Sequence, residues 1–215
     1  MSAFESIIDF ILAIEGGHHT DPHDPGGETN FGISRRAYPD EDIASMTAAR
    51  AREIYHRDYW VKSFCDALPV PIAALMMGGA VNQGVNGCIR CLQRVLKVTD
   101  DGIIGPQTMD AIEHAGSLER LIDNFSAERC VLYSDTRNFI HYRRGWFRRL
   151  MRCHALAVRL LAETDRYSGG PQGGDLEETE NGANSTDRDH PDRPLSAAPD
   201  TVPVRDMGGL LCDVE

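Results

Sequence analysis

The sequence predicts a mainly α-helical protein with one small β element, followed by an acidic tail. Apolar residues recur every three or four positions through most segments up to residue 162, which is the periodicity of helices with one buried face. Turn-forming residues concentrate between residues 18 and 34, and the stretch 163–215 has almost no aromatic residues. A length of 215 residues with 41% hydrophobic residues suits one domain, or one domain with a small companion.

Seven helices are expected. The first is a stripe of Phe4, Ile7, Ile8, Ile11 and Leu12, which Gly16-Gly17 ends. Proline favours the first turn of a helix, so Pro69 and Pro71 open the third and Pro106 opens the fifth. The expected ranges are 2–15, 45–60, a helix that begins after Pro69 and Pro71 and continues through Gln83, 86–96, a helix from 106, 117–137 and 142–163. Between the first two helices, residues 29–33 are expected to form a short strand, most simply in a hairpin.

The negative charge of the chain belongs to its tail. The formal net charge is −11, of which residues 163–215 carry −9 and residues 1–162 only −2. The tail is rich in Gly, Pro, Ser, Asp and Glu, so it cannot bury enough apolar surface to offset its ordering entropy. We expect residues 163–215 to be disordered, and the overall acidity says nothing about an active surface.

No segment resembles a membrane span or a signal peptide. The apolar stretch 4–14 is short, includes Glu5 and Asp9, and lacks a basic start. We therefore expect the protein to be made in the cytoplasm and not to insert stably into a membrane. A role in the periplasm or cell wall would then need assisted export or release. We also expect a monomer. Six dispersed cysteines favour a reduced compartment. Cys88 and Cys91 form one CxxC inside a helical pattern and are expected to be small buried residues.

Glu15 is the most informative residue of the sequence. It continues the apolar stripe of the first helix, four positions after Ile11 and seven after Ile8. Partial burial of a carboxyl group favours its neutral form, which is what a general acid needs near neutral pH. Gly16 and Gly17 leave the neighbouring backbone open to a bulky polymer. The alternative is a glutamate in a solvated last turn.

Asp24 and Thr29 follow Glu15 in a turn-rich loop and the following strand. Glycosidases use two carboxyl groups that flank the scissile bond. Asp24 could stabilise positive charge at the sugar or orient a water, and the Thr29 hydroxyl could hold that water. Alternatively, Asp24 is a turn residue before Pro25 and Thr29 an ordinary strand residue.

These residues carry a resemblance to glycoside hydrolase family 108, the N-acetylmuramidases of phage endolysins and related bacterial enzymes. Two segments of the chain resemble blocks of this family. The first is Glu15-Gly-Gly followed by Asp21-Pro-His-Asp-Pro-Gly-Gly-Glu-Thr-Asn-Phe-Gly-Ile-Ser34, which resembles the family signature, and the second is Ala80-Val-Asn-Gln-Gly84. Leu92-Gln-Arg-Val-Leu96, Asp101-Gly-Ile-Ile-Gly-Pro-Gln-Thr108 and Gly145-Trp-Phe-Arg-Arg149 resemble the predicted peptidoglycan domain that follows it.

The resemblance implies a lysozyme-like helical domain at 1–90, a small helical, peptidoglycan-binding subdomain at 91–162, and the tail at 163–215. It implies cleavage of the β-1,4 bond between N-acetylmuramic acid and N-acetylglucosamine, without metal or organic cofactor. The Glu, Asp, Thr spacing is also similar to that of phage lysozymes, with Glu15 as proton donor. Expected substrate contacts are Gly16, Gly17, Asn30 and Asn82.

Two departures from the family pattern keep alternatives open. His18 stands where an aromatic residue is usual, and Gly78-Gly79 stands where an aspartate is common. A protein that binds peptidoglycan without cutting it is therefore one alternative. Lytic transglycosylase chemistry is another, because one acid can serve that reaction.

Two further constellations have competing interpretations. His18, His19, Asp21, His23 and Asp24 could ligate zinc in a peptidase, but they crowd into one loop without an HExxH helix, so solvated side chains are favoured. Seven arginines and no acid lie between residues 137 and 162. They could bind an anionic polymer or surface, or pair with acids of other helices; no nucleic-acid motif accompanies them, so nucleic acid is not expected as a partner.

Overall fold

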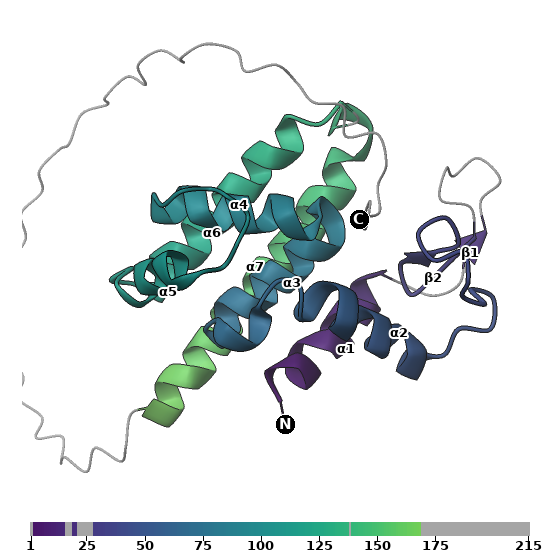
Figure 1. Ribbon diagram of the computed structural model, residues 1–215, viewed down its shortest axis with the longest axis horizontal. Helices are drawn as coiled ribbons and strands as arrows, with labels where there is room; N and C mark the ends of the chain where they lie inside the picture. The colour runs from purple at the N-terminus through teal and green to yellow at the C-terminus, as the bar shows by residue number, and fades with distance from the viewer. Residues whose placement is uncertain (1, 16–18, 21–27, 138, 169–215) are drawn as a thin grey trace, which may run out of the picture.

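The computed structural model describes residues 2–15, 19–20, 28–137 and 139–168, and it shows the predicted mainly α-helical fold (Figure 1). The helices are α1 Ala3–Glu15, α2 Ala48–Tyr55, α3 Val70–Gln83, α4 Val85–Leu96, α5 Pro106–Glu113, α6 Leu118–Ser134 and α7 Phe139–Ser168. Short strands are β1 His19–Thr20, β2 Glu28–Asn30 and β3 Ile33–Ser34. The predicted disorder is wrong for residues 163–168, which continue α7, and the rest of the tail lies outside the described residues.

Local sequence signals place most helix starts within a few residues. Pro69 and Pro106 lie where α3 and α5 begin, as predicted. The Thr47 hydroxyl accepts a hydrogen bond from the Arg50 backbone N–H at 3.2 Å and caps α2, two residues after the predicted start. The predicted helix 45–60 changes type within its length, because His56–Trp60 forms a π-helical turn after α2.

The β element is a three-stranded antiparallel sheet in the order β1-β2-β3. Thr29 of β2 lies opposite His19 of β1 and Ser34 of β3. The prediction of one strand over 29–33 is wrong, because Phe31 and Gly32 have φ angles of 51° and 76° and form a reverse turn between β2 and β3.

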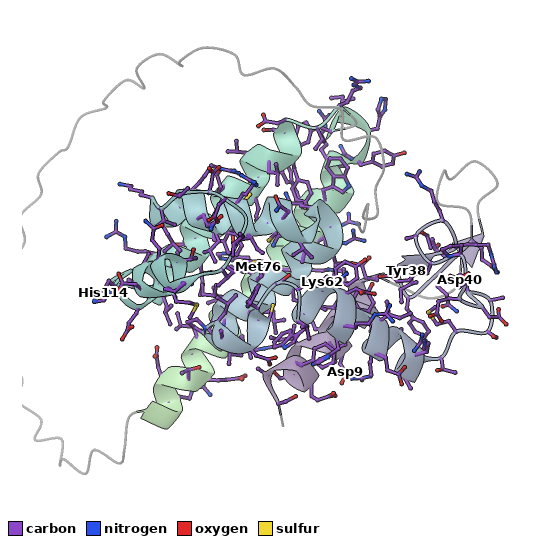
Figure 2. The ribbon with its side chains drawn as sticks, viewed as in Figure 1. Asp9, Tyr38, Asp40, Lys62, Met76 and His114 are labelled. Atoms are coloured by element: carbon purple, nitrogen blue, oxygen red, sulfur yellow. The ribbon has the colours of Figure 1, made fainter. Side chains whose placement is uncertain are left out.

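Helix α3 is the centre of the fold, and its sequence is apolar on all sides. Its residues from Pro71 to Val81 are all buried, with α4, α6 and α7 packed around it. Figure 2 shows Met76 of α3 deep among the helices, whereas Asp9 and His114 lie at the periphery. One apolar cluster runs from Phe4 to Leu160, so the first and last helices of the described chain share a core. None of the described helices is long and apolar enough to cross a membrane.

Two consecutive glycines let neighbouring helices approach α3 closely. A Cβ atom on Gly78 would lie 2.5 Å from the Cys153 Sγ of α7, and one on Gly79 would lie 2.1 Å from the Cys88 Sγ of α4. Close helix packing therefore explains why this chain has Gly78-Gly79 where an aspartate is common in the family that it resembles. Cys88 and Cys91 are both buried free thiols, as expected.

A buried arginine ties α6 to α3. The Arg129 side chain is completely buried; its Nε donates to Gln83 Oε1 at 2.7 Å and its Nη1 donates to the Leu75 carbonyl at 3.0 Å. The Gln83 amide donates in return to the Arg129 carbonyl at 3.0 Å. These bonds fix the end of α3 that carries the site described next.

Candidate active site

Glu15 lies at the last position of α1, with its side chain only 7% exposed. The heptad stripe that buries Ile8 and Ile11 turns the carboxyl group toward the protein, as the sequence predicted. Burial raises the pKa of Glu15, because the charged form loses hydration. Its place at the negative end of the α1 dipole favours the neutral form as well.

Two polar side chains meet the Glu15 carboxyl from other helices. The Arg149 Nη2 of α7 lies 3.0 Å from Glu15 Oε2, and the Asn82 side chain of α3 hydrogen-bonds the carboxyl. Arg149 also donates to Asn82 Oδ1, and the Asn82 amide donates to the Gly78 carbonyl at 2.8 Å. Both partners lower the pKa of Glu15, but burial is the larger effect and the pKa stays raised.

The turn between β2 and β3 also lies against Glu15. A Cβ atom on Gly32 would lie 2.9 Å from Glu15 Cβ and 2.8 Å from the Tyr55 hydroxyl oxygen. The Tyr55 hydroxyl donates to the Phe31 carbonyl at 2.8 Å and holds this turn against α2. Glycine is therefore required at position 32 by space as well as by its positive φ.

The predicted site residues occupy different environments. Asn82 lies beside Glu15, as expected for a residue of the site. Thr29 is half-buried in β2, close to the turn that contacts Glu15. Asn30 is 6% exposed, and its amide donates to the Ile43 carbonyl at 3.1 Å, which is a structural bond. Gly16, Gly17 and Asp24 lie outside the described residues, so their roles stay predictions, as do the catalytic role of Thr29 and the substrate contact of Asn30.

Sequence reasoning did not assign Arg149 and Tyr55 to the site. Arg149 is far from Glu15 in the sequence, and it is one of seven arginines in its segment. Its only sequence signal is its position in the Gly145-Trp-Phe-Arg-Arg149 block. Tyr55 lies on the predicted second helix and resembles an ordinary core residue, since it is 1% exposed.

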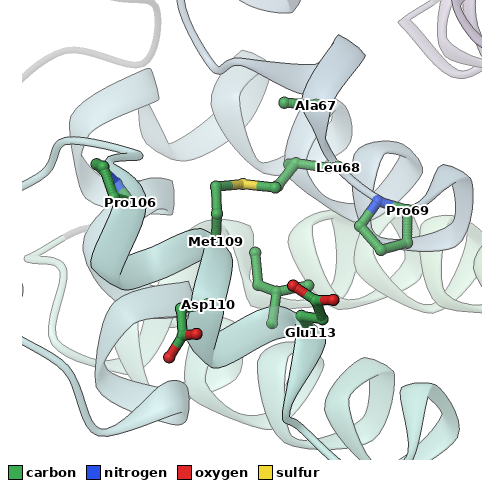
Figure 3. A pocket seen from close by; sticks show the side chains of 8 residues that line it. Ala67, Leu68, Pro69, Pro106, Met109, Asp110 and Glu113 are labelled. Carbon is green, nitrogen blue, oxygen red and sulfur yellow. The ribbon is translucent and has the colours of Figure 1, made fainter.

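Of the residues in the zinc interpretation, His18, Asp21, His23 and Asp24 lie outside the described ranges, and His19 lies in β1. Among the described residues, no group of three or more His, Cys, Asp or Glu side chains is arranged to hold a metal ion. A separate hollow lies between residues 67–69 and α5, where Met109 extends toward Leu68 (Figure 3). Its acids, Asp110 and Glu113, are exposed, so this hollow offers no desolvated carboxyl like that of Glu15.

Comparison with known families agrees with this geometry. Residues 8–84 match the family model described as glycosyl hydrolase 108, and this range contains Glu15, Gly32, Tyr55 and Asn82. Over this range the chain is similar to glycosyl hydrolase family 108. Residues 87–151 match the model described as a predicted peptidoglycan domain, which contains Arg149. The protein is therefore a glycoside hydrolase that acts on peptidoglycan.

The fold is also similar to that of a solved structure. SagA of Brucella abortus is 27% identical in sequence, and the match covers 73% of this chain and 94% of that chain with a TM-score of 0.68. None of the curated proteins matches the chain. Glu15 therefore lies in the glycosyl hydrolase region, whereas its partner Arg149 comes from the peptidoglycan region.

Proposed function

We propose that this protein is an N-acetylmuramidase that hydrolyses the β-1,4 bond between N-acetylmuramic acid and N-acetylglucosamine, with Glu15 as the general acid. The observation that carries the proposal is the buried Glu15 carboxyl with its raised pKa. A neutral carboxyl group can protonate the glycosidic oxygen, which an ionised and hydrated one cannot do. The cell wall is the proposed place of action.

In the proposed reaction, the Glu15 O–H donates its proton to the glycosidic oxygen as the bond from that oxygen to C1 breaks. Positive charge develops at C1, and a water molecule then attacks C1, loses a proton that restores the protonated acid, and leaves a reducing end. Bound sugar also displaces water from Glu15, which further favours its neutral form before the proton is transferred. Arg149 and Asn82 hold the carboxyl in place and bind its charged form after the transfer.

Asp24 and Thr29 complete the proposed machinery. Asp24 would stabilise the charge at C1 or, with the Thr29 hydroxyl, orient the attacking water. The position of Thr29 in β2, next to the turn that contacts Glu15, supports this assignment. Gly16, Gly17 and Asn82 are proposed to contact the sugar beside the cleaved bond.

The decisive experiment is the substitution Glu15→Gln, which keeps the shape of the side chain and removes the proton. We expect wall-lysing activity to fall about a hundredfold or more, as is usual when a general acid is lost. The matched control is Glu163→Gln, at an exposed position of α7. Retention of most activity by a folded Glu15→Gln protein would overturn the assignment, and binding without new reducing ends in the unmodified protein would indicate a binding module.

A second candidate is a lytic transglycosylase. A single acid suffices when the C6 hydroxyl of the muramic acid attacks C1 in place of water. Mass spectrometry of the products separates the two reactions, because transglycosylation yields anhydro sugars and hydrolysis yields reducing ends.

A further inference from the structure

Helix α7 continues beyond the end of α3 on the side of the active site. The two helices run antiparallel, and their contacts advance by one turn, from Gly78 with Cys153 to Asn82 with Arg149. Helix α3 then ends at Gln83, and Gly84 turns the chain away with a φ of 78°. The next turn of α7, centred on Gly145, therefore has no partner residue of α3 opposite it.

Gly145 leaves an open place on this turn. A Cβ atom on Gly145 would meet no atom of the described residues within 4 Å, in contrast to Gly78 and Gly79. Glycine is among the least favourable residues inside a helix, and packing does not require it here. A close approach of a ligand to the helix backbone is a physical reason for such a glycine.

An aromatic platform stands beside this open place. Tyr142, three residues before Gly145, is 50% exposed and stacks on Trp146 with ring centroids 5.8 Å apart. Trp146 stacks in turn on Tyr133 of α6 at 5.1 Å. Trp146 and Tyr133 are buried, so Tyr142 is the exposed end of a fixed stack and offers a rigid apolar surface to the flat face of a sugar ring.

Unpaired positive charge borders the same turn. Arg148 and Arg149 follow Gly145 by three and four residues, so both are its neighbours on the helix surface, and Arg152 lies one turn further on. Arg149 pairs with Glu15. Arg148 and Arg152 are exposed, and no carboxylate of the described ranges forms an ion pair with them, so of the two alternatives, pairing with acids of other helices does not occur at these positions.

We propose that this face of α7, formed by Tyr142, Gly145, Arg148 and Arg152, holds the peptidoglycan strand beyond the bond cleaved at Glu15. Tyr142 precedes Arg149 by two helical turns, about 10 Å, which is the length of about one disaccharide. The sugar stacks on Tyr142 and lies over Gly145, and the carboxylates of its peptide stems meet Arg148 and Arg152. This inference rests on the proposed function and extends it to substrate length and charge.

The test of the open place is Gly145→Ala. Because alanine favours a helix and meets no neighbour here, the melting temperature should rise by about 2–4 °C. The KM for long strands should nevertheless rise severalfold, whereas turnover of the shortest cleavable fragment should not change. Gly87→Ala is the matched control, since its new methyl group would make an ordinary contact of 3.8 Å with Leu132. An unchanged KM in Gly145→Ala would overturn the proposal.

The charged part is tested with Arg148→Gln/Arg152→Gln against Arg120→Gln/Arg166→Gln, which removes the same charge at other exposed positions. The first variant should bind insoluble peptidoglycan severalfold more weakly and with less salt dependence, and the two should bind chitin, a glycan without carboxylates, equally. Equal binding of both to intact peptidoglycan would overturn the proposal. The proposal would also be overturned if the first variant lost binding only to double-stranded DNA, because that result would indicate a nucleic-acid surface. The proposed function is tested separately, by the wall-lysing activity of the Glu15→Gln variant.

Discussion

The close contact between α3 and α7 can be tested with a double-mutant cycle of Gly78→Ala and Cys153→Ala. An alanine at position 78 places its Cβ 2.5 Å from Cys153 Sγ, about 1 Å closer than the optimum contact of ~3.5 Å. Such overpacking costs about 1–3 kcal/mol in the free energy of unfolding. The better helix propensity of alanine returns about 1 kcal/mol, so the net loss should be about 1 kcal/mol.

Removal of the sulfur should reverse the sign of this effect. In the Cys153→Ala background, the nearest atom of residue 153 is its Cβ, which would lie at a tolerable 3.4 Å. Gly78→Ala should then stabilise the protein by about 0.5–1 kcal/mol through helix propensity alone. The coupling energy between the two substitutions is therefore expected to be about 1–3 kcal/mol.

Urea titration of the four proteins, followed by the fluorescence of the tryptophans, measures this coupling. Additive effects within about 0.5 kcal/mol would refute the close-contact argument. Activity supplies a second measurement, because Asn82 donates to the Gly78 carbonyl and contacts Arg149 one turn further along the same helix pair. A shift of α7 in Gly78→Ala should therefore also disturb the site at Glu15.

Two other substitutions test the environment of Glu15. Arg149→Gln removes a positive charge that lowers the pKa of Glu15, so this pKa should rise further. Because the reaction needs the protonated acid, the alkaline limb of the pH–rate profile should then move to higher pH. A limb that stays or moves to lower pH would contradict the assigned ion pair. Tyr55→Phe removes the bond to the Phe31 carbonyl and should cost about 1 kcal/mol in urea titrations, with slower turnover; unchanged values for both would show that the hydroxyl does not hold the turn.

Local signals explain why so much of the fold was predictable. The stripe from Phe4 to Leu12 fixes both the helix and the face on which Glu15 lies. Prolines mark two helix starts, because a proline in the first turn loses no hydrogen bond. Periodicity indicated a buried Glu15 but left a solvated last turn as the alternative; in the structure the side chain is buried, and burial raises its pKa.

The features that were missed depend on contacts between distant segments. Phe31 adopts a positive φ that its residue type does not indicate, and this breaks the predicted strand into β2 and β3. The π-helical turn after Tyr55 interrupts an otherwise continuous helical pattern. Among the arginines after residue 137, only packing of α7 on α3 selects Arg149 to face inward.

The ion pair between Glu15 and Arg149 bears on how such enzymes can be recombined. The two family regions are consecutive in the sequence, yet each contributes one member of this pair. A chimera that joins residues 1–84 to an unrelated wall-targeting module would lack the cation beside its acid and leave the apolar surface of α3 uncovered. Exchange between relatives should therefore succeed only when both regions are transferred together, as one inherited unit.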